Sequence, residues 1–239
     1  MYKLKWSNYK LIEIIFYISI FFPYLTFFTR KIDTSPYSLI IATFVIIIAL
    51  IKKAKVPKYI FVLFLLFLFS FLLLSTSTIN FSVIRIVAGY YSVFVIAWAT
   101  YYIIKINNYN IKEKLMYNFI LIWFFVGIVQ TVFYPDFMTF FLDRVNTGFG
   151  RGVVSLSPEP TYYGTVAIFL FLISFILDYK VKETAIITFI IVTFLSKSST
   201  AFMILLFISI LYFFLFLLNK KNIFLVFLFI LSFIILFNI

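Results

Sequence analysis

Residues 59–74 read YIFVLFLLFLFSFLLL, an apolar run interrupted only by Ser70. A bilayer is spanned by about 20 apolar residues, and irregular backbone is not tolerated in hydrocarbon, so this run predicts a transmembrane helix. Eight more apolar runs predict further helices, at about 11–28, 37–51, 84–104, 115–133, 161–177, 184–195, 200–218 and 223–239. The sequence therefore predicts an all-α fold: one transmembrane domain over residues 1–239, a bundle of about nine helices.

The composition agrees with lipid as the main solvent of this chain. Hydrophobic residues make up 65% of the 239 and charged residues 12%, with a mean hydropathy of +1.16. Soluble domains carry about a quarter charged residues. The chain has neither cysteine nor histidine, which excludes thiol chemistry, Ser-His-Asp catalysis and metal sites built on histidine.

The net charge of +12 does not indicate nucleic-acid binding, because the basic residues lie between the apolar runs and not on one face. Basic residues in such loops indicate how the chain is oriented in the membrane. One set of alternate loops holds 14 lysines, in the N-terminus, 52–58, 105–114, 180–182 and 220–221. The other set holds six Lys and Arg, in 30–31, 85, 144–151 and 197. By the positive-inside rule the N-terminus is cytoplasmic, and the loop at about 134–160 is extracytoplasmic.

Two of the expected runs differ from an ordinary membrane span. The first follows a basic N-terminus, but residues 21–28, FFPYLTFF, offer no small-residue cleavage site, so we expect an uncleaved helix. The run 184–195 would cover only about 18 Å as a helix. It is either a half-span or a helix that recruits flanking residues.

The loop 134–160, YPDFMTFFLDRVNTGFGRGVVSLSPEP, concentrates charge more than any other part of the chain. Arg151 lies between Gly150 and Gly152, a pattern that favours backbone amides approaching an anion beside a guanidinium fork. The alternative is a flexible loop whose arginine reaches lipid headgroups. Arg144 lies in the same loop, with Asp136 and Asp143 nearby.

Glu159 precedes the helix expected from Thr161, with Pro160 suited to the first helical position. It is either a site carboxylate or a helix-capping acid. In SKSST, residues 196–200, Lys197 suits an anionic group, and we expect the hydroxyls to cap the next helix. Elsewhere, Arg85 is expected to snorkel, and Glu13 and Gln130 to be buried hydrogen-bonding residues.

Two short stretches resemble a known family. Residues 151–164 read R-G-x-x-S-L-S-P-E-P-T-x-x-G at the start of a helix, and residues 195–201 read LSKSSTA before another long helix. Together with the hydropathy layout, they resemble bacterial O-antigen and capsular polysaccharide polymerases of the Wzy type. Histidine-dependent O-antigen ligases fit less well, because this chain has no histidine.

The resemblance implies a metal-independent membrane glycosyltransferase of the bacterial cytoplasmic (inner) membrane. Such an enzyme joins repeat units carried on undecaprenyl diphosphate into O-antigen, capsule or exopolysaccharide, without cofactors. Carried over by position, Arg151 binds the donor diphosphate and Glu159 acts as base or organises the site. Arg144 and Lys197 are further candidates for the same anion. The expected partners are lipid-linked oligosaccharides, membrane lipids and a chain-length regulator, and no nucleic acid.

Two other classes stay open. Family members usually have more helices and a further large external loop, whereas this chain stops at Ile239 within an apolar run, so a short, inactive member is one alternative. A flippase or transporter for lipid-linked glycans is the other. It is disfavoured because ionisable residues cluster near the ends of the runs rather than at mid-membrane.

Overall fold

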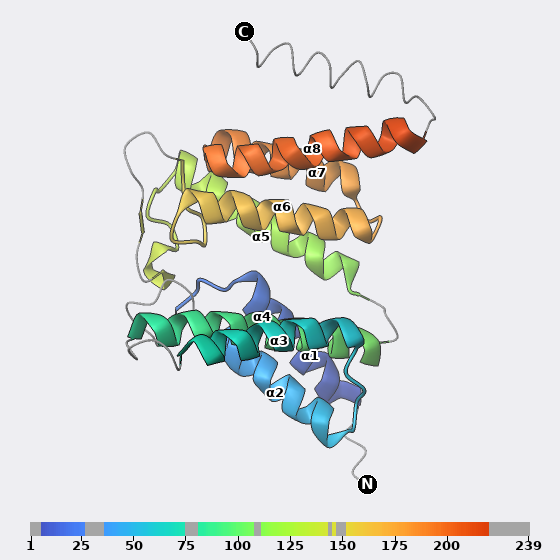
Figure 1. Ribbon diagram of the computed structural model, residues 1–239. Coiled ribbons are helices and arrows are strands. Elements are labelled where there is room, and N and C mark those ends of the chain that lie inside the picture. The colour runs from blue at the N-terminus through green and yellow to red at the C-terminus, as the bar shows by residue number, and fades with distance from the viewer. Residues whose placement is uncertain are drawn as a thin grey trace. The chain divides into compact units, whose positions relative to one another are not determined.

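The computed structural model describes residues 6–26, 36–74, 81–107, 111–142, 145–146 and 152–219. This part of the chain is all-helical and has no strand, as predicted (Figure 1). Its α-helices are α1 Trp6–Phe21, α2 Tyr37–Ile51, α3 Lys58–Leu74, α4 Phe81–Ile106, α5 Glu113–Val132, α6 Pro160–Ile176, α7 Val181–Ile190 and α8 Ser199–Asn219. A short 3₁₀ helix, η1 Thr139–Phe141, and a π-helical turn, η2 Ile191–Leu195, complete the set.

Each helix coincides with one of the expected apolar runs, and the ninth run, 223–239, lies outside the described residues. Both boundaries of the first run were wrong, and its helix begins earlier than expected, at Trp6. The run 11–28 ends as a helix at Phe21, because Pro23 disfavours helical backbone at the residue before it. The short run 184–195 gains three residues from its flank, since helix continues from Val181 through η2 to Leu195.

The described residues pack into two compact units. Unit 1 takes in residues 1–115 and 140–144. In it α2 and α3 both pack against α4, and α1 packs against α2. Small side chains at these contacts, such as Ala42, Ala49 and Ala99, are fully buried and let the helices approach closely.

Unit 2 takes in residues 116–139 and 145–239. Here α6 is the central helix and packs against α7, η2 and α8. Ile168, Val192 and Ala201 form the buried centre of that contact. Trp123 of α5 stacks on Tyr163 of α6, with ring centroids 5.9 Å apart, so α5 joins the same unit.

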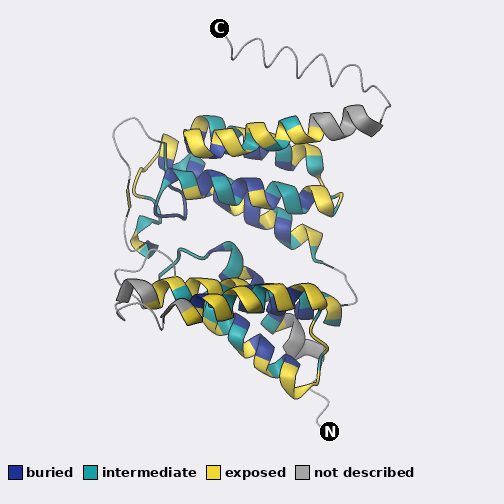
Figure 2. Cartoon of the chain, viewed as in Figure 1, coloured by how far each residue is buried: buried dark blue, intermediate teal, exposed yellow. Residues whose placement is uncertain are grey.

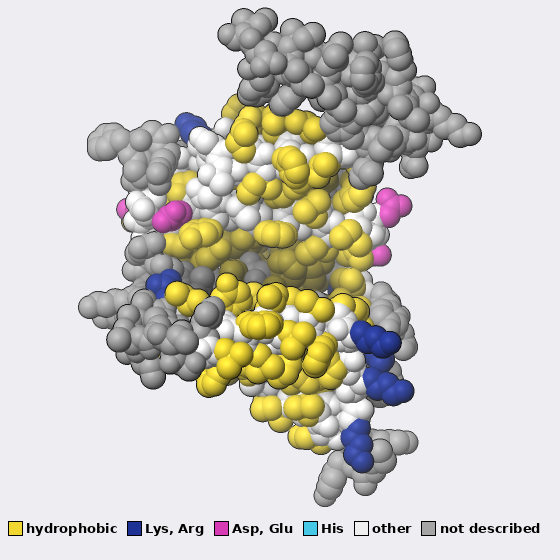
Figure 3. Space-filling view, viewed as in Figure 1, with side chains coloured by type: hydrophobic (Ala, Val, Ile, Leu, Met, Phe, Trp, Pro, Cys, Tyr) yellow, Lys and Arg dark blue, Asp and Glu magenta, His cyan; other side chains and the backbone are white. Residues whose placement is uncertain are grey.

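Two described helical stretches, Ile84–Ile106 and Glu113–Val132, are long and apolar enough to cross a membrane. The apolar stretches Tyr37–Ile51, Lys58–Leu72, Pro160–Ile176 and Ser199–Tyr212 are shorter. Figure 2 shows that α3 is exposed along most of its length, although nearly all of its side chains are apolar. Apolar side chains also cover much of the visible surface of both units (Figure 3).

Candidate functional site

Gln130, near the end of α5, fixes the segment that precedes α6. Its Oε1 accepts the Ser155 N–H at 2.6 Å, and its Nε2 donates to the Ser155 carbonyl at 2.9 Å and to the Phe137 carbonyl at 2.8 Å. Gln130 is only 1% exposed. The expectation of a buried hydrogen-bonding residue is therefore confirmed, with loop backbone as its partner.

The same segment is tied to α5 and α6 through the carbonyl oxygen of Trp123. Ser155 Oγ donates to this oxygen at 2.9 Å and the Tyr163 hydroxyl donates to it at 3.0 Å. Gly127, one turn further along α5, leaves the space that the Tyr163 ring occupies. These bonds give the backbone before α6 one fixed position on the end of α5.

The two stretches singled out in the sequence, 151–164 and 195–201, lie against each other over their described residues. Val153 N–H donates to the Leu195 carbonyl at 2.8 Å. Ser198 Oγ donates to Thr161 Oγ1 at 3.1 Å. Thr161 is in the first turn of α6 and Ser198 immediately precedes α8, so the N-termini of these two helices meet here.

Gly152 has a different role from the one expected. A Cβ on this residue would overlap the backbone of Leu195 and Ser196, so glycine is needed for contact with the protein itself. The amide of Val153 is already bonded to Leu195 and is not directed at a ligand. An anion-binding nest that includes this amide is therefore excluded by the structure.

Lys197 lies in the turn that follows the π-helical segment η2. In η2 the Ser196 N–H donates to the Ile191 carbonyl at 2.7 Å, a π-type bond of the kind often found at functional sites. Lys197 then adopts a left-handed backbone with φ of 47° and is exposed between the buried Ser196 and Ser198. Ser198 Oγ accepts the Ala201 N–H at 3.3 Å, so the predicted capping of the next helix is confirmed.

Glu159 occupies the N-cap position of α6, and Pro160 is the first helical residue, as predicted. Its backbone is extended and its side chain makes no capping hydrogen bond. The carboxylate is half-buried, and its Oε1 lies 3.5 Å from Asn146 Nδ2. Ser157 Oγ donates to the backbone carbonyl of Glu159 at 2.8 Å and so fixes the backbone at this residue. The Glu159 carboxylate does not cap α6.

The structure thus brings the segment of Glu159 and the turn of Lys197 to one end of unit 2. Arg144 and Arg151, the other two predicted site residues, lie outside the described residues, as does Asp143. Thr161 belongs to the quoted motif but was not predicted as a site residue, and Gln130 and Asn146 are contributors that lie outside the two stretches. Of the last two, only Gln130 had a signal, an amide side chain inside an apolar run.

Among the described residues, no three acidic side chains gather to hold a metal ion. Comparison of the chain with protein-family models, with curated proteins and with solved structures found no match. The positive ends of the α6 and α8 dipoles, together with Lys197, make this end of unit 2 suited to a negatively charged ligand.

Proposed function

We propose that this chain is a polysaccharide polymerase that joins undecaprenyl-diphosphate-linked repeat units on the outer face of the bacterial cytoplasmic membrane. One observation carries the proposal. The two stretches on which the family resemblance rests lie against each other through the Val153–Leu195 and Ser198–Thr161 bonds, at one end of unit 2. Residues that form a shared site must meet in this way, although they are far apart in the sequence.

A multi-pass location is supported by the exposed apolar surface. Phe61, Phe69 and Phe71 of α3 are each more than half exposed, as are Met203 and Phe207 of α8. Monomeric soluble proteins rarely expose continuous apolar patches of this extent. We therefore treat all nine apolar runs as membrane helices, with the end of unit 2 that carries Glu159 and Lys197 outside.

The reaction transfers a glycosyl group from the lipid diphosphate to a sugar hydroxyl of the acceptor. As the bond between the anomeric carbon and the phosphate oxygen breaks, negative charge develops on the leaving lipid diphosphate. Preorganised positive groups stabilise that charge. Arg151 is the proposed principal cation, Arg144 and Lys197 assist, and the α6 and α8 N-termini add to the field.

Glu159 is the proposed base that receives the proton of the attacking hydroxyl. A carboxylate in this role contributes about 10²–10⁴-fold to a rate. Its position supports the assignment, because the Pro160 ring fixes the direction of the helix while the carboxylate makes no capping bond. No metal or other cofactor enters this scheme.

The test is polymer length in cells that carry Arg151→Lys or Glu159→Ala. Both variant proteins should remain in the membrane but fail to extend the polysaccharide. Lysine cannot bind a phosphate group in the bidentate way that arginine does, and alanine cannot accept a proton. Lys55→Gln and Glu183→Ala change exposed charges elsewhere and should leave chain length unchanged. Long chains made by both site variants would refute the site.

A second assay separates polymerisation from transport and from an inactive chain. Purified protein in detergent is given lipid-linked repeat units with no sealed compartment present. Chain growth excludes pure transport, since transport needs two compartments. If the purified protein is folded and sediments normally but does not join these repeat units, the proposal is overturned.

A further inference from the structure

A strongly basic surface lies at one end of unit 1, where the turn from α2 to α3 meets the end of α4. Its five lysines are all exposed: Lys52, Lys53, Lys55, Lys58 and Lys105. Figure 3 shows Lys and Arg side chains gathered at this end of the unit. The sequence has no acidic residue between Asp33 and Glu113, so α2, α3 and α4 supply no acid to balance these charges.

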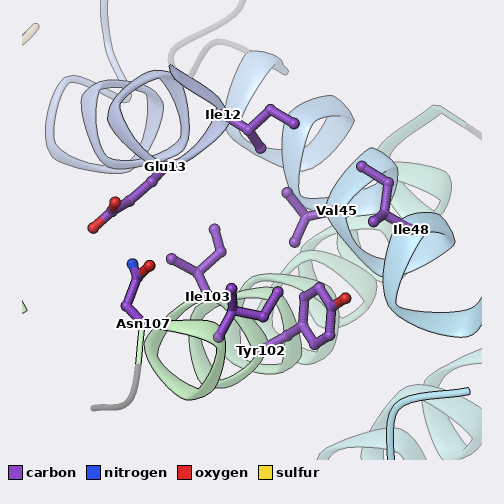
Figure 4. Close-up of a pocket in the computed structure, with 8 residues that line it drawn as sticks. Ile12, Glu13, Val45, Ile48, Tyr102, Ile103 and Asn107 are labelled. Carbon is purple, nitrogen blue, oxygen red and sulfur yellow. The ribbon is translucent and has the colours of Figure 1, made fainter. Parts of the chain in front are cut away.

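The acid that α1 brings to this unit does not balance the basic surface either. Glu13 is buried, pairs with Lys112 at 2.8 Å and points toward Asn107 beside a pocket between α1, α2 and α4 (Figure 4). None of the last four lysines of the basic surface forms an ion pair with a described residue. Because like charges at short range repel, the surface favours an anion from outside the chain.

The backbone of the turn holds a lysine at a position that favours glycine. Helix α2 ends in a Schellman motif, in which the Ala54 N–H donates to the Ala49 carbonyl and the Lys53 N–H to the Leu50 carbonyl, both at 2.9 Å. Lys53 has a φ of 53°, where glycine is the usual residue because it has no Cβ. Membrane orientation needs basic residues in this loop but not at this residue. The charge at position 53 is therefore kept at a cost to the fold.

Tyrosines mark the level of this surface relative to lipid. Tyr59 of α3 packs edge-on against Tyr101 of α4, with ring centroids 6.0 Å apart, and Lys105 Nζ lies 5.6 Å from the centre of the Tyr101 ring. Tyrosine is enriched at the level of the lipid headgroups. Further along α3, Phe61 and Phe69 are more than half exposed. A lipid phosphate at the level of the tyrosines would meet the lysines, and its acyl chains would lie beside α3.

We propose that the basic surface of unit 1 binds the phosphate of an anionic phospholipid in the leaflet that faces the cytoplasm. Lys58 is the first residue of α3, where the positive end of the helix dipole adds to its charge. A lipid fits better than a soluble acidic protein, because the lysines adjoin a helix whose exposed side chains are apolar. The binding rests on the proposed membrane location and not on the polymerase reaction, since it uses neither Glu159 nor Lys197.

Titration of the purified full chain in detergent with phosphatidylglycerol, followed by native mass spectrometry, measures this binding directly. The wild type should bind phosphatidylglycerol more tightly than the zwitterionic phosphatidylcholine. A lysine near an anionic lipid surface contributes about fivefold to binding, so Lys55→Gln and Lys58→Gln in one chain should weaken phosphatidylglycerol binding about 25-fold. Equal binding of the two lipids by the wild type would overturn the proposal.

A matched control removes two lysines that have acidic neighbours. Lys114 and Lys182 are exposed, and each lies next to a glutamate in the sequence. Lys114→Gln with Lys182→Gln gives the same net charge as the first double variant and should leave phosphatidylglycerol binding nearly unchanged. Equal losses in the two double variants would mean that only net charge was measured, and the site would be refuted. Displacement of the lipid by inorganic phosphate, beyond the effect of sodium chloride at equal ionic strength, would also overturn it.

Lys53→Gly separates the charge from the fold. Glycine relieves the left-handed backbone, so in phosphatidylcholine nanodiscs the variant should have a higher Tm than the wild type. In phosphatidylglycerol nanodiscs this gain should shrink or reverse, because a lysine that binds the phosphate is lost. An equal gain in both lipids would refute the role of Lys53. None of these measurements depends on polymer synthesis, so failure of the polymerase proposal would leave them unaffected.

Discussion

Ser155 shows how individual residues hold the candidate site. It adopts a left-handed backbone with φ of 54°, which is uncommon for a residue with a Cβ, and it is fully buried. Such a conformation costs about 1–2 kcal/mol. Three hydrogen bonds, two with the Gln130 side chain and one with the Trp123 carbonyl, offset that cost. The residues after the turn, Glu159 included, are placed by these contacts.

Replacing Gln130 should therefore destabilise unit 2. Gln130→Leu removes the partners of the Ser155 N–H and carbonyl and of the Phe137 carbonyl, and buried backbone groups left unpaired cost about 1–3 kcal/mol each. We expect a loss of about 3 kcal/mol or more in the free energy of unfolding, measured by denaturant titration in detergent. Thr131→Ala, which removes only a local bond to Gly127, is the matched control. Equal effects of the two would contradict the anchoring role.

Gly127 and Gly89 form a second matched pair. A Cβ on Gly127 would overlap the Tyr163 hydroxyl, whereas a Cβ on Gly89 would meet nothing within 4 Å. Gly127→Ala should lower stability by about 1–3 kcal/mol through overpacking. Gly89→Ala should raise it by up to about 1 kcal/mol, because alanine favours helix.

The Tyr163→Phe variant tests whether the Tyr163 hydroxyl causes the loss of stability expected for Gly127→Ala. In that background Gly127→Ala should cost less than in the wild type, since the nearest overlapping atom is gone. The comparison is made by thermal unfolding of all four proteins. A cost that does not depend on the hydroxyl would contradict the packing described for these two helices.

At this scale the sequence predicted what local rules determine. Pro160 at the first helical position, the capping by Ser198 and the burial of Gln130 were all predictable, because each depends on chain neighbours or on an apolar surrounding. The contact of Gly152 with Leu195 and Ser196 was not predictable from the sequence. It joins residues more than forty positions apart, and no local pattern encodes that distance.

The elements were predicted well because hydrophobic runs are long and turns between them are polar. Seven helices start and end within a few residues of their expected runs, whereas α1 begins earlier than expected, at Trp6, and ends before Pro23. The π turn η2 was not predicted. Its extra residue has no signature in the apolar pattern, yet it sets the direction of the Ser196–Ser198 turn that meets α6.

Gly152→Ala tests the contact between the two segments. The new Cβ would overlap backbone atoms, which cannot move aside as a flexible side chain does. We expect the segment before α6 to shift and polymer extension to fall at least tenfold, because a misplacement of about 1 Å in a site can cost 10²-fold. Helical content by circular dichroism should be retained, and Gly89→Ala serves as control. Normal chain length in the Gly152 variant would show that this contact does not matter for the site.

At the scale of the molecule, several contacts within each unit join residues that the charge pattern assigns to the same side. Glu13 of α1, which lies near the expected cytoplasmic end of the run 11–28, pairs with Lys112, a lysine of the expected cytoplasmic set. Thr26, near the expected outer end of the run 11–28, bonds to Phe141 of the loop 134–160, which is expected outside. In unit 2, Lys180 lies over the Tyr117 ring at 4.2 Å, at the end that the charge pattern assigns to the cytoplasm. The alternation expected of a chain that crosses a membrane repeatedly is thus consistent within each unit.

The central claim is that the Glu159 and Lys197 end of unit 2 faces outward. The chain has no cysteine, so Lys197→Cys and Lys53→Cys each provide a single thiol at an exposed turn. With a membrane-impermeant maleimide, the thiol at 197 should be labelled in cells whose cytoplasmic membrane is intact, and the thiol at 53 only after that membrane is opened. Labelling of position 53 in intact cells, with position 197 protected until lysis, would contradict the account.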